Sequence, residues 1–180
     1  SREIVMRAER ASEVMNGYFR ALIATRRRDP SDDLISALIG LRDDGDRLSE
    51  DELVATIVLL FAAGFETTTN LIGNGLAALL AHPEEMERLR AEPALMPNAV
   101  EEMLRFEPSV QLDARTALVD ADVGGIDVSA GEVVLTLLGA ANRDPARYPE
   151  PDRFDVARTG HQHLAFAAGQ AAGRDVAVCL

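Results

Sequence analysis

The chain has 180 residues, 47% of them hydrophobic, which is enough to form one substantial apolar core. Its 18 lysines and arginines against 30 aspartates and glutamates give a formal net charge of −12. That charge repels phosphate backbones and anionic lipid, so neither nucleic acid nor a membrane is an expected partner. A single cysteine forms no internal disulfide and the first residues lack a secretory signal, so we expect a cytoplasmic protein.

The first half of the sequence predicts helices. Apolar residues recur every three or four positions from Arg2 to about Arg28, and a shorter helix is expected over residues 32–41. Ser49 and Glu52 form an S-x-x-E capping box at the start of a long helix that runs to about residue 82. The apolar run in this helix is too short for a membrane span and predicts a buried core helix.

The residue pattern changes in the second half of the sequence. Pro83 and Pro97 each fit the first turn of a further helix. After Pro108, short apolar runs separated by glycines predict a few strands and turns, and residues 142–160 form a loop rich in proline and arginine. We find no internal repeat or linker and expect one domain, residues 1–180, that is mainly α with a small β component.

The stretch "AAGFETTTN", residues 62–70, conflicts with its place in the middle of a long helix. Gly64 and three consecutive threonines are poor helix formers, and the carboxylate of Glu66 is costly inside an apolar helix. We expect the threonine hydroxyls to bond to carbonyls one turn earlier and to open the helix locally for a small ligand or water. A solvated polar patch is the ordinary alternative.

Two short charged motifs follow. In "EEMLR", Glu102 and Arg105 lie at i and i+3 on one helix face, where most such pairs are ordinary surface ion pairs. In "PDRF", residues 151–154, Arg153 is a candidate third member of a fixed network with that pair.

The order of these motifs, ending in F-x-x-G, resembles the cytochrome P-450 family of haem-thiolate monooxygenases. The phrases "AGFETTTNLIGNGL", "EEMLRFEPSVQLDART", "GAANRDPARYPEPDRFDV" and "HLAF" are similar to bacterial members. The resemblance covers roughly the C-terminal half of the family's fold and implies a partial P-450 fold with a long central helix, shorter packed helices and a small sheet.

The resemblance implies monooxygenation of a small organic substrate with a haem cofactor and a ferredoxin-type electron donor. Glu66 and Thr67 match the acid and the alcohol that deliver protons during oxygen activation. Ala63 and Gly64 match positions where small residues let the haem lie close to the helix. Arg115 matches the partner of a haem propionate.

The resemblance also assigns structural roles. Glu102, Arg105 and Arg153 match the network that supports the cysteine loop, so their expected role is in folding. Phe166 and Gly169 match the start of that loop.

The cysteine is displaced from the position that the resemblance requires. With Phe166 on the family's loop phenylalanine, Gly173 falls on the ligating cysteine, and the single cysteine is Cys179, six residues further on. Resemblance ends near Gly169. We therefore predict that this chain does not bind haem as a thiolate complex and holds no metal ligand at Gly173. His161 and His163 lie near the loop, but neither aligns with the ligand position.

Three interpretations remain open at this point. The chain is a truncated or degenerate family member that is inactive on its own, a haem-free relative that binds and activates a partner enzyme, or part of a longer competent enzyme. In the first case, an uncovered apolar helix predicts a large exposed apolar patch and self-association.

Overall fold

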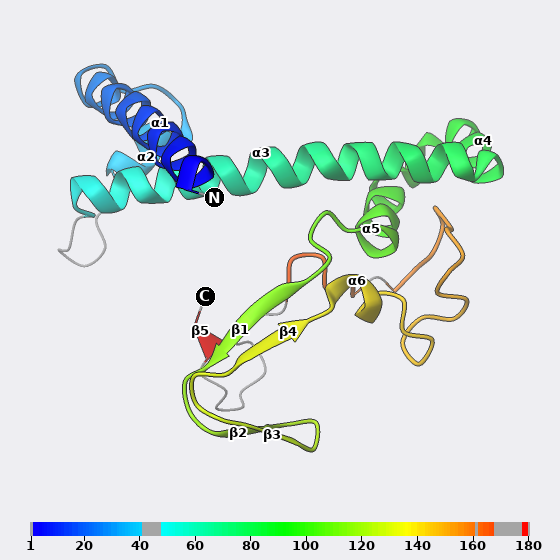
Figure 1. Cartoon of the computed structure of the whole chain (residues 1–180). Helices are drawn as coiled ribbons and strands as arrows, with labels where there is room; N and C mark the ends of the chain where they lie inside the picture. Colours follow the sequence, from blue (N-terminus) through cyan, green and yellow to red (C-terminus); the bar gives the residue numbers. More distant parts are fainter. Residues whose placement is uncertain (1, 41–47, 161, 168–177, 180) are drawn as a thin grey trace. The chain divides into compact units, whose positions relative to one another are not determined.

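The computed structural model describes residues 2–40, 48–160, 162–167 and the backbone of 178–179 (Figure 1). The chain divides into two compact units, residues 1–66 and residues 67–180, and each is described by itself. The long helix α3 (Glu50–Ala81) contributes to both.

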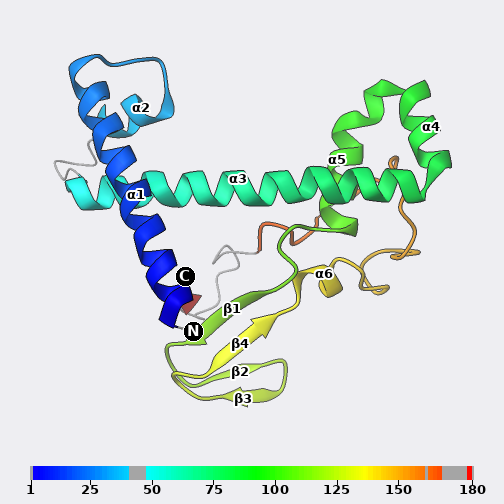
Figure 2. The same cartoon turned by 45° about the horizontal axis from the view of Figure 1, so that its top comes forward.

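The first unit is helical and has its own apolar core. Helix α1 (Arg2–Arg28) has the predicted bounds, and α2 (Leu34–Gly40) is shorter than predicted (Figures 1 and 2). Helix α2 begins late because Asp33 is its N-cap: the Asp33 carboxylate accepts the N–H of Ser36 at 2.8 Å. The core side chains come from α1 and from the first turns of α3: Phe19, Ile23, Leu53, Val54 and Ile57.

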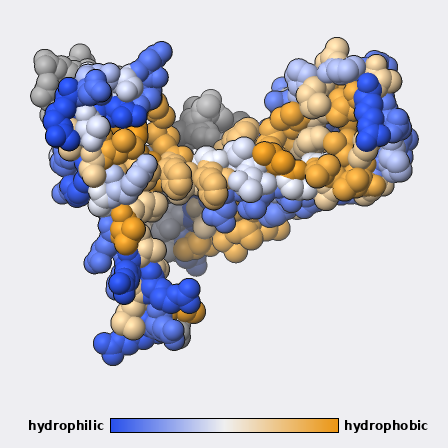
Figure 3. Space-filling model, turned by 90° about the horizontal axis from the view of Figure 1, so that it is seen from above, coloured by the Kyte–Doolittle hydropathy of each residue, from blue (hydrophilic) through white to orange (hydrophobic). Residues whose placement is uncertain are grey.

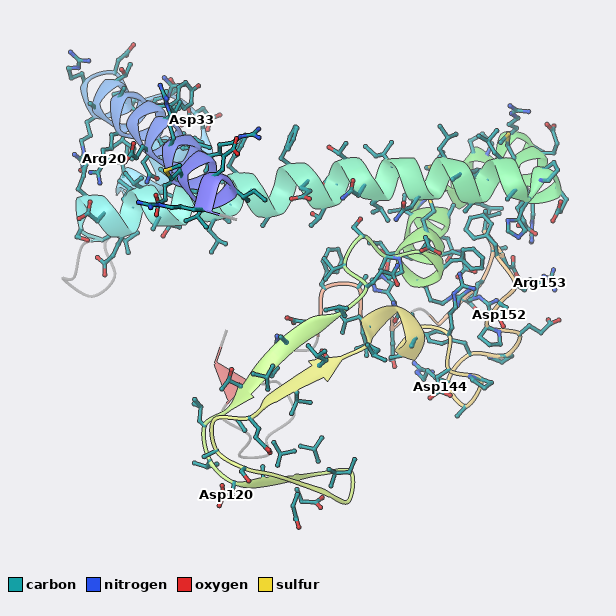
Figure 4. The ribbon with its side chains drawn as sticks, in the orientation of Figure 1. Arg20, Asp33, Asp120, Asp144, Asp152 and Arg153 are labelled. Carbon is teal, nitrogen blue, oxygen red and sulfur yellow. The ribbon has the colours of Figure 1, made fainter. Side chains whose placement is uncertain are left out.

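Asp33 is also an ion-pair partner in this unit. Its carboxylate accepts a hydrogen bond from the guanidinium of Arg26 on α1. The N–H of Ser36 and then this guanidinium lower the pKa of Asp33 below its ordinary value, because both interactions favour the charged carboxylate. Figure 4 labels Asp33 beside α1.

The predicted capping box at the start of α3 is confirmed. Ser49 N–H donates to Glu52 Oε2 at 2.8 Å, and Glu52 N–H donates to Ser49 Oγ at 3.2 Å. The predicted local opening at residues 62–70 does not occur, since α3 is α-helical without interruption. Propagating a long helix adds one backbone bond per residue, and this outweighs the modest propensity cost of one glycine and three threonines.

The second unit packs short helices against the later turns of α3. Proline occupies the first turns of α4 (Pro83–Ala91), the short 3-10 helix η1 (Pro93–Leu95) and α5 (Met96–Phe106). The core of this unit joins α3, α4 and α5 to the loop predicted over residues 142–160, and consists of Ala78, Leu89, Ala99, Phe154 and Val156.

The strands form two small antiparallel sheets. One has the order β4 (Val133–Thr136), β1 (Asp113–Ala117), β5 (Val178–Cys179), with Asp113 opposite Thr136 and Thr116 opposite Cys179. The other is a hairpin of β2 (Ala121–Val123) and β3 (Ile126–Val128). Its turn residues are glycines with φ of 64° and 86°, as a two-residue type I′ hairpin requires.

Helix α6 (Leu138–Ala141) was not predicted: the apolar run that predicts strands ends at Leu138, and no element was expected from the sequence for residues 139–141. A tertiary contact accompanies this helix, since the N–H of Gly139 donates to the carbonyl of Gln111 at 3.1 Å instead of to a neighbouring strand.

The expectation that α3 is a buried core helix holds mainly for its first turns, where Leu53, Val54 and Ile57 are buried. In the second unit Ile72, Leu76 and Leu80 lie at i, i+4 and i+8 on one face, and they are 67%, 54% and 65% exposed. We call these three residues the apolar row of α3. Figure 3 shows that hydrophobic surface is exposed in the described part of the molecule. The predicted exposure of apolar surface is thereby confirmed. By length and composition alone α3 could cross a membrane, but the core helix of a soluble protein passes the same test.

Candidate functional site

The centre of the second unit is a buried ion pair one helical turn apart. Glu102 and Arg105 on α5 are both 0% exposed. Arg105 Nε donates to Glu102 Oε2 at 2.7 Å and Nη2 donates to Oε1 at 2.9 Å, which is a bidentate arrangement. A buried charge of this kind is tolerable only when its remaining hydrogen-bonding groups are satisfied.

Arg105 satisfies them with backbone carbonyls from the loop that follows α6. Nη1 donates to the carbonyls of Asn142 at 2.9 Å and Pro151 at 2.8 Å, and Nη2 donates to that of Arg153 at 3.2 Å. With the two bonds to Glu102, the five N–H groups of a guanidinium are all used. The helix and the loop are therefore held together by one side chain.

Arg153 enters this network through its backbone and not through its guanidinium. Its side chain is 55% exposed and lies 3.4 Å from Glu150, on the outside of the loop, where Figure 4 labels it beside Asp152. The second buried guanidinium belongs to Arg158, which is 11% exposed and donates to Glu102 Oε1 at 3.2 Å.

Arg158 was missed from the sequence because no local signal marks it. It follows the buried Phe154 and Val156 in a turn, in which the N–H of Arg158 donates to the carbonyl of Asp155 at 2.9 Å. Arg158 also donates to the carbonyls of Pro149 at 2.8 Å, Glu150 at 3.0 Å and Arg153 at 2.8 Å.

Glu66 and Thr67, the predicted acid and alcohol, are consecutive residues of α3. Glu66 is exposed and Thr67 is half-buried. In the second unit, the hydroxyl of Ser109 donates to the backbone carbonyl of Thr67 at 2.6 Å, and the amide of Asn74 donates to the carbonyl of Glu107 at 3.2 Å. The segment after α5 is thus tied to α3 at the turn that carries Thr67. Ser109 carries no sequence motif that predicts this contact.

The two small residues predicted to lie beside a haem are on the surface of α3. Ala63 and Gly64 are both exposed, and a Cβ atom added at Gly64 would meet nothing within 4 Å. This open surface is compatible with the predicted role.

Arg115, the predicted partner of a haem propionate, lies on β1 with its side chain 18% exposed. Its guanidinium pairs with the carboxylate of Asp113 on the same strand and donates to the carbonyl of Ala114 at 3.0 Å. A propionate at this position would compete with the carboxylate of Asp113.

The residues near the predicted ligand loop are only partly described. Phe166 is 80% exposed, whereas Gly169, Gly173 and His161 lie outside the described residues. The backbone of Cys179, which carries the chain's one thiol, belongs to β5 and pairs with Thr116 of β1.

His163 is no better as an iron ligand. Its Nε2 lies 3.0 Å from Glu101 Oε2, and its Nδ1 accepts the N–H of Ala165 at 3.3 Å, so both ring nitrogens are engaged. Neither His163 nor the glycine that the sequence places at position 173 therefore supplies a thiolate ligand for haem iron.

Comparison with known proteins identifies the family. The model of the cytochrome P-450 family matches residues 1–169. The chain belongs to the cytochrome P-450 family. Its members are haem-dependent monooxygenases, and residues 170–180 lie outside the match.

Similar proteins include the biotin biosynthesis cytochrome P-450 of Bacillus subtilis, which is 47% identical over 84% of this chain and 38% of its own length. The 6-deoxyerythronolide B hydroxylase of Saccharopolyspora erythraea is 44% identical over 91% of this chain and 40% of its own. This chain therefore spans about two fifths of the length of these relatives.

A solved structure has the same fold over the shared region. The crystal structure of P450BioI with hexadec-9Z-enoic acid ligated acyl carrier protein gives a TM-score of 0.87 at 43% identity, covering 95% of this chain and 44% of that one. The predicted partial P-450 fold is thus confirmed.

Proposed function

We propose that this chain carries the proton-delivery pair and the structural network of a cytochrome P-450 monooxygenase, and that it does not perform haem-thiolate catalysis on its own. The observation that carries the proposal is the register of the ligand loop: Gly173 falls at the cysteine position, and the chain's one thiol, Cys179, lies on a strand paired with β1. A glycine offers no side chain to iron.

The remaining parts of the proposal follow from family membership. In a complete enzyme the haem would supply oxygen activation, and the residues of this chain would supply the groups around it. Glu66 and Thr67 would deliver protons, and Arg115 would hold a propionate after giving up its bond to Asp113. The substrate would be a small organic molecule, the electron donor a ferredoxin-type protein, and the location cytoplasmic.

The experiment is a spectrum of the protein expressed with added haem precursor, reduced and exposed to carbon monoxide. We expect no haem-thiolate absorption band. A band that appears and is lost in the Cys179→Ser variant would identify Cys179 as a ligand and overturn the proposal. Haem uptake without that band would leave the proposal standing, and replacing His163 would then test for imidazole ligation.

A haem-free protein that binds a partner enzyme is the second candidate, in which the apolar row of α3 would contact that partner instead of a second copy of this chain. Three large apolar side chains on one face of a helix are typical of a protein-protein contact. A compact, haem-free monomer with a sharp thermal transition in sedimentation and calorimetry would support this candidate. Aggregation of the purified chain would count against it.

A further inference from the structure

We propose that Asn142 is a positioning residue that couples the buried Glu102–Arg105 pair to residues 163–165, so that the chain just before the ligand loop is held in place without haem. The importance of that segment rests on the proposed function. The coupling itself rests on contacts within the second unit.

Asn142 bonds in two directions at once. It is 1% exposed and directly follows α6. Its backbone carbonyl accepts Arg105 Nη1 at 2.9 Å, and its side-chain Oδ1 accepts the N–H of Leu164 at 2.7 Å. The residue thus connects α5, 37 positions earlier, to a segment 22 positions later.

The other half of the Asn142 side chain is unsatisfied. Its amide nitrogen is buried and has no hydrogen-bond partner in the described part of the chain. An apolar residue of the same size would fill this space without leaving a donor unpaired, so packing alone does not explain an asparagine here. The oxygen that holds Leu164 does explain it.

A second anchor fixes the same short segment to α5. His163, with its side chain 7% exposed, pairs with Glu101, the residue next to Glu102 on the helix. Its other ring nitrogen accepts the N–H of Ala165. His163 and Leu164 are therefore held by Glu101 of α5 and by Asn142, and the His163 ring in turn holds Ala165.

A turn follows directly after this segment. The N–H of Ala167 donates to the carbonyl of Leu164 at 2.9 Å, and Ala167 has a φ of 58°, in the left-handed region that favours glycine. The residue that Asn142 holds is thus also the acceptor of the first bond of this turn.

The test compares two near-isosteric replacements by NMR amide exchange on the whole haem-free chain. Asn142→Leu removes the acceptor, whereas Asn142→Asp keeps an oxygen at the position that accepts the N–H of Leu164. Asn98→Leu is the matched control, because the Asn98 amide donates to the carbonyl of Val156 at 2.7 Å elsewhere in the same unit.

We expect Asn142→Leu to raise the exchange rate of the Leu164 amide about tenfold, the effect of losing one net hydrogen bond. Asn142→Asp should stay within about threefold of wild type, and Asn98→Leu should leave this amide unchanged. A general loss of stability would instead raise exchange throughout the unit. No change in Asn142→Leu, an equal rise in Asn98→Leu, or equal behaviour of the Asp and Leu variants at position 142 would overturn the proposal.

The wild-type protein provides a result that depends on no variant folding. Its Leu164 amide should exchange as slowly as the interior amides of α5, and exchange at the rate of an unstructured peptide would overturn the proposal. Because this experiment uses no haem, its outcome is independent of the carbon monoxide spectrum.

Discussion

Two arginines of the same loop should differ sharply when each is replaced by alanine. Arg158 makes one bond to Glu102 and three to backbone carbonyls, and its side chain is 11% exposed. Hydrogen bonds from a charged donor contribute about 1.5–3 kcal/mol each, but these four share one guanidinium and are not additive. We expect Arg158→Ala to lower the free energy of unfolding of the second unit by about 3 kcal/mol.

Arg153→Ala is the matched comparison. The Arg153 side chain is 55% exposed and contacts only the exposed Glu150 in the part of the chain that the structure describes, while its carbonyl, which Arg105 and Arg158 use, survives the substitution. An exposed pair of this kind contributes about 0–1 kcal/mol. Urea unfolding of each variant, followed by NMR signals of the second unit, measures the difference. Equal losses, or a larger loss from Arg153→Ala, would refute the assignment of the second guanidinium to Arg158.

Three further predictions concern other parts of the chain. The lowered pKa of Asp33 means that its stabilising effect is present above its unfolded pKa and is lost as pH falls below about 4, so Asp33→Asn should flatten the pH dependence of urea unfolding in the first unit. Gly73→Ala should stabilise α3 by about 0.5–1 kcal/mol in thermal unfolding, because alanine has the higher helix propensity. Gly75→Ala should stabilise it less, since the added Cβ would lie 2.5 Å from Met103 Sδ. Equal stabilisation by the two variants would contradict this packing. Ile72→Lys should reduce self-association in sedimentation velocity without changing unfolding, and unchanged association would show that the apolar row is not the contact.

The helix boundaries were predictable because their signals are local. The capping box at Ser49 lies within four residues of the helix that it starts, and the prolines of α4 and α5 mark first turns in the same way. The short helix at residues 138–141 has no such local signal. It accompanies a bond from Gly139 to Gln111, which no window around either residue reveals.

The contacts of the candidate site also fall into two kinds, those that follow from local spacing and those that depend on distant segments. Glu102 and Arg105 are one turn apart, so their pairing follows from helical spacing. Which loop arginine completes the network depends on how a segment 56 residues away enters the core, and Phe154 and Val156 determine that direction by their burial. Asn142 and Ser109 carry no recognisable motif, and their roles appear only when distant segments are brought together.

The buried pair on α5 also has a consequence for synthesis of the chain. Arg105 requires carbonyl groups 37, 46 and 48 residues later, and Glu102 is paired with an arginine 56 residues later. At ribosomal rates of about 5–20 residues per second, the last of these leaves the ribosome about 3–11 s after Glu102. Until then Glu102 and Arg105 lack some of their hydrogen-bond partners, and burying their charges is unfavourable. We therefore expect α5 to stay exposed to solvent during translation and the second unit to pack only after Arg158 has emerged.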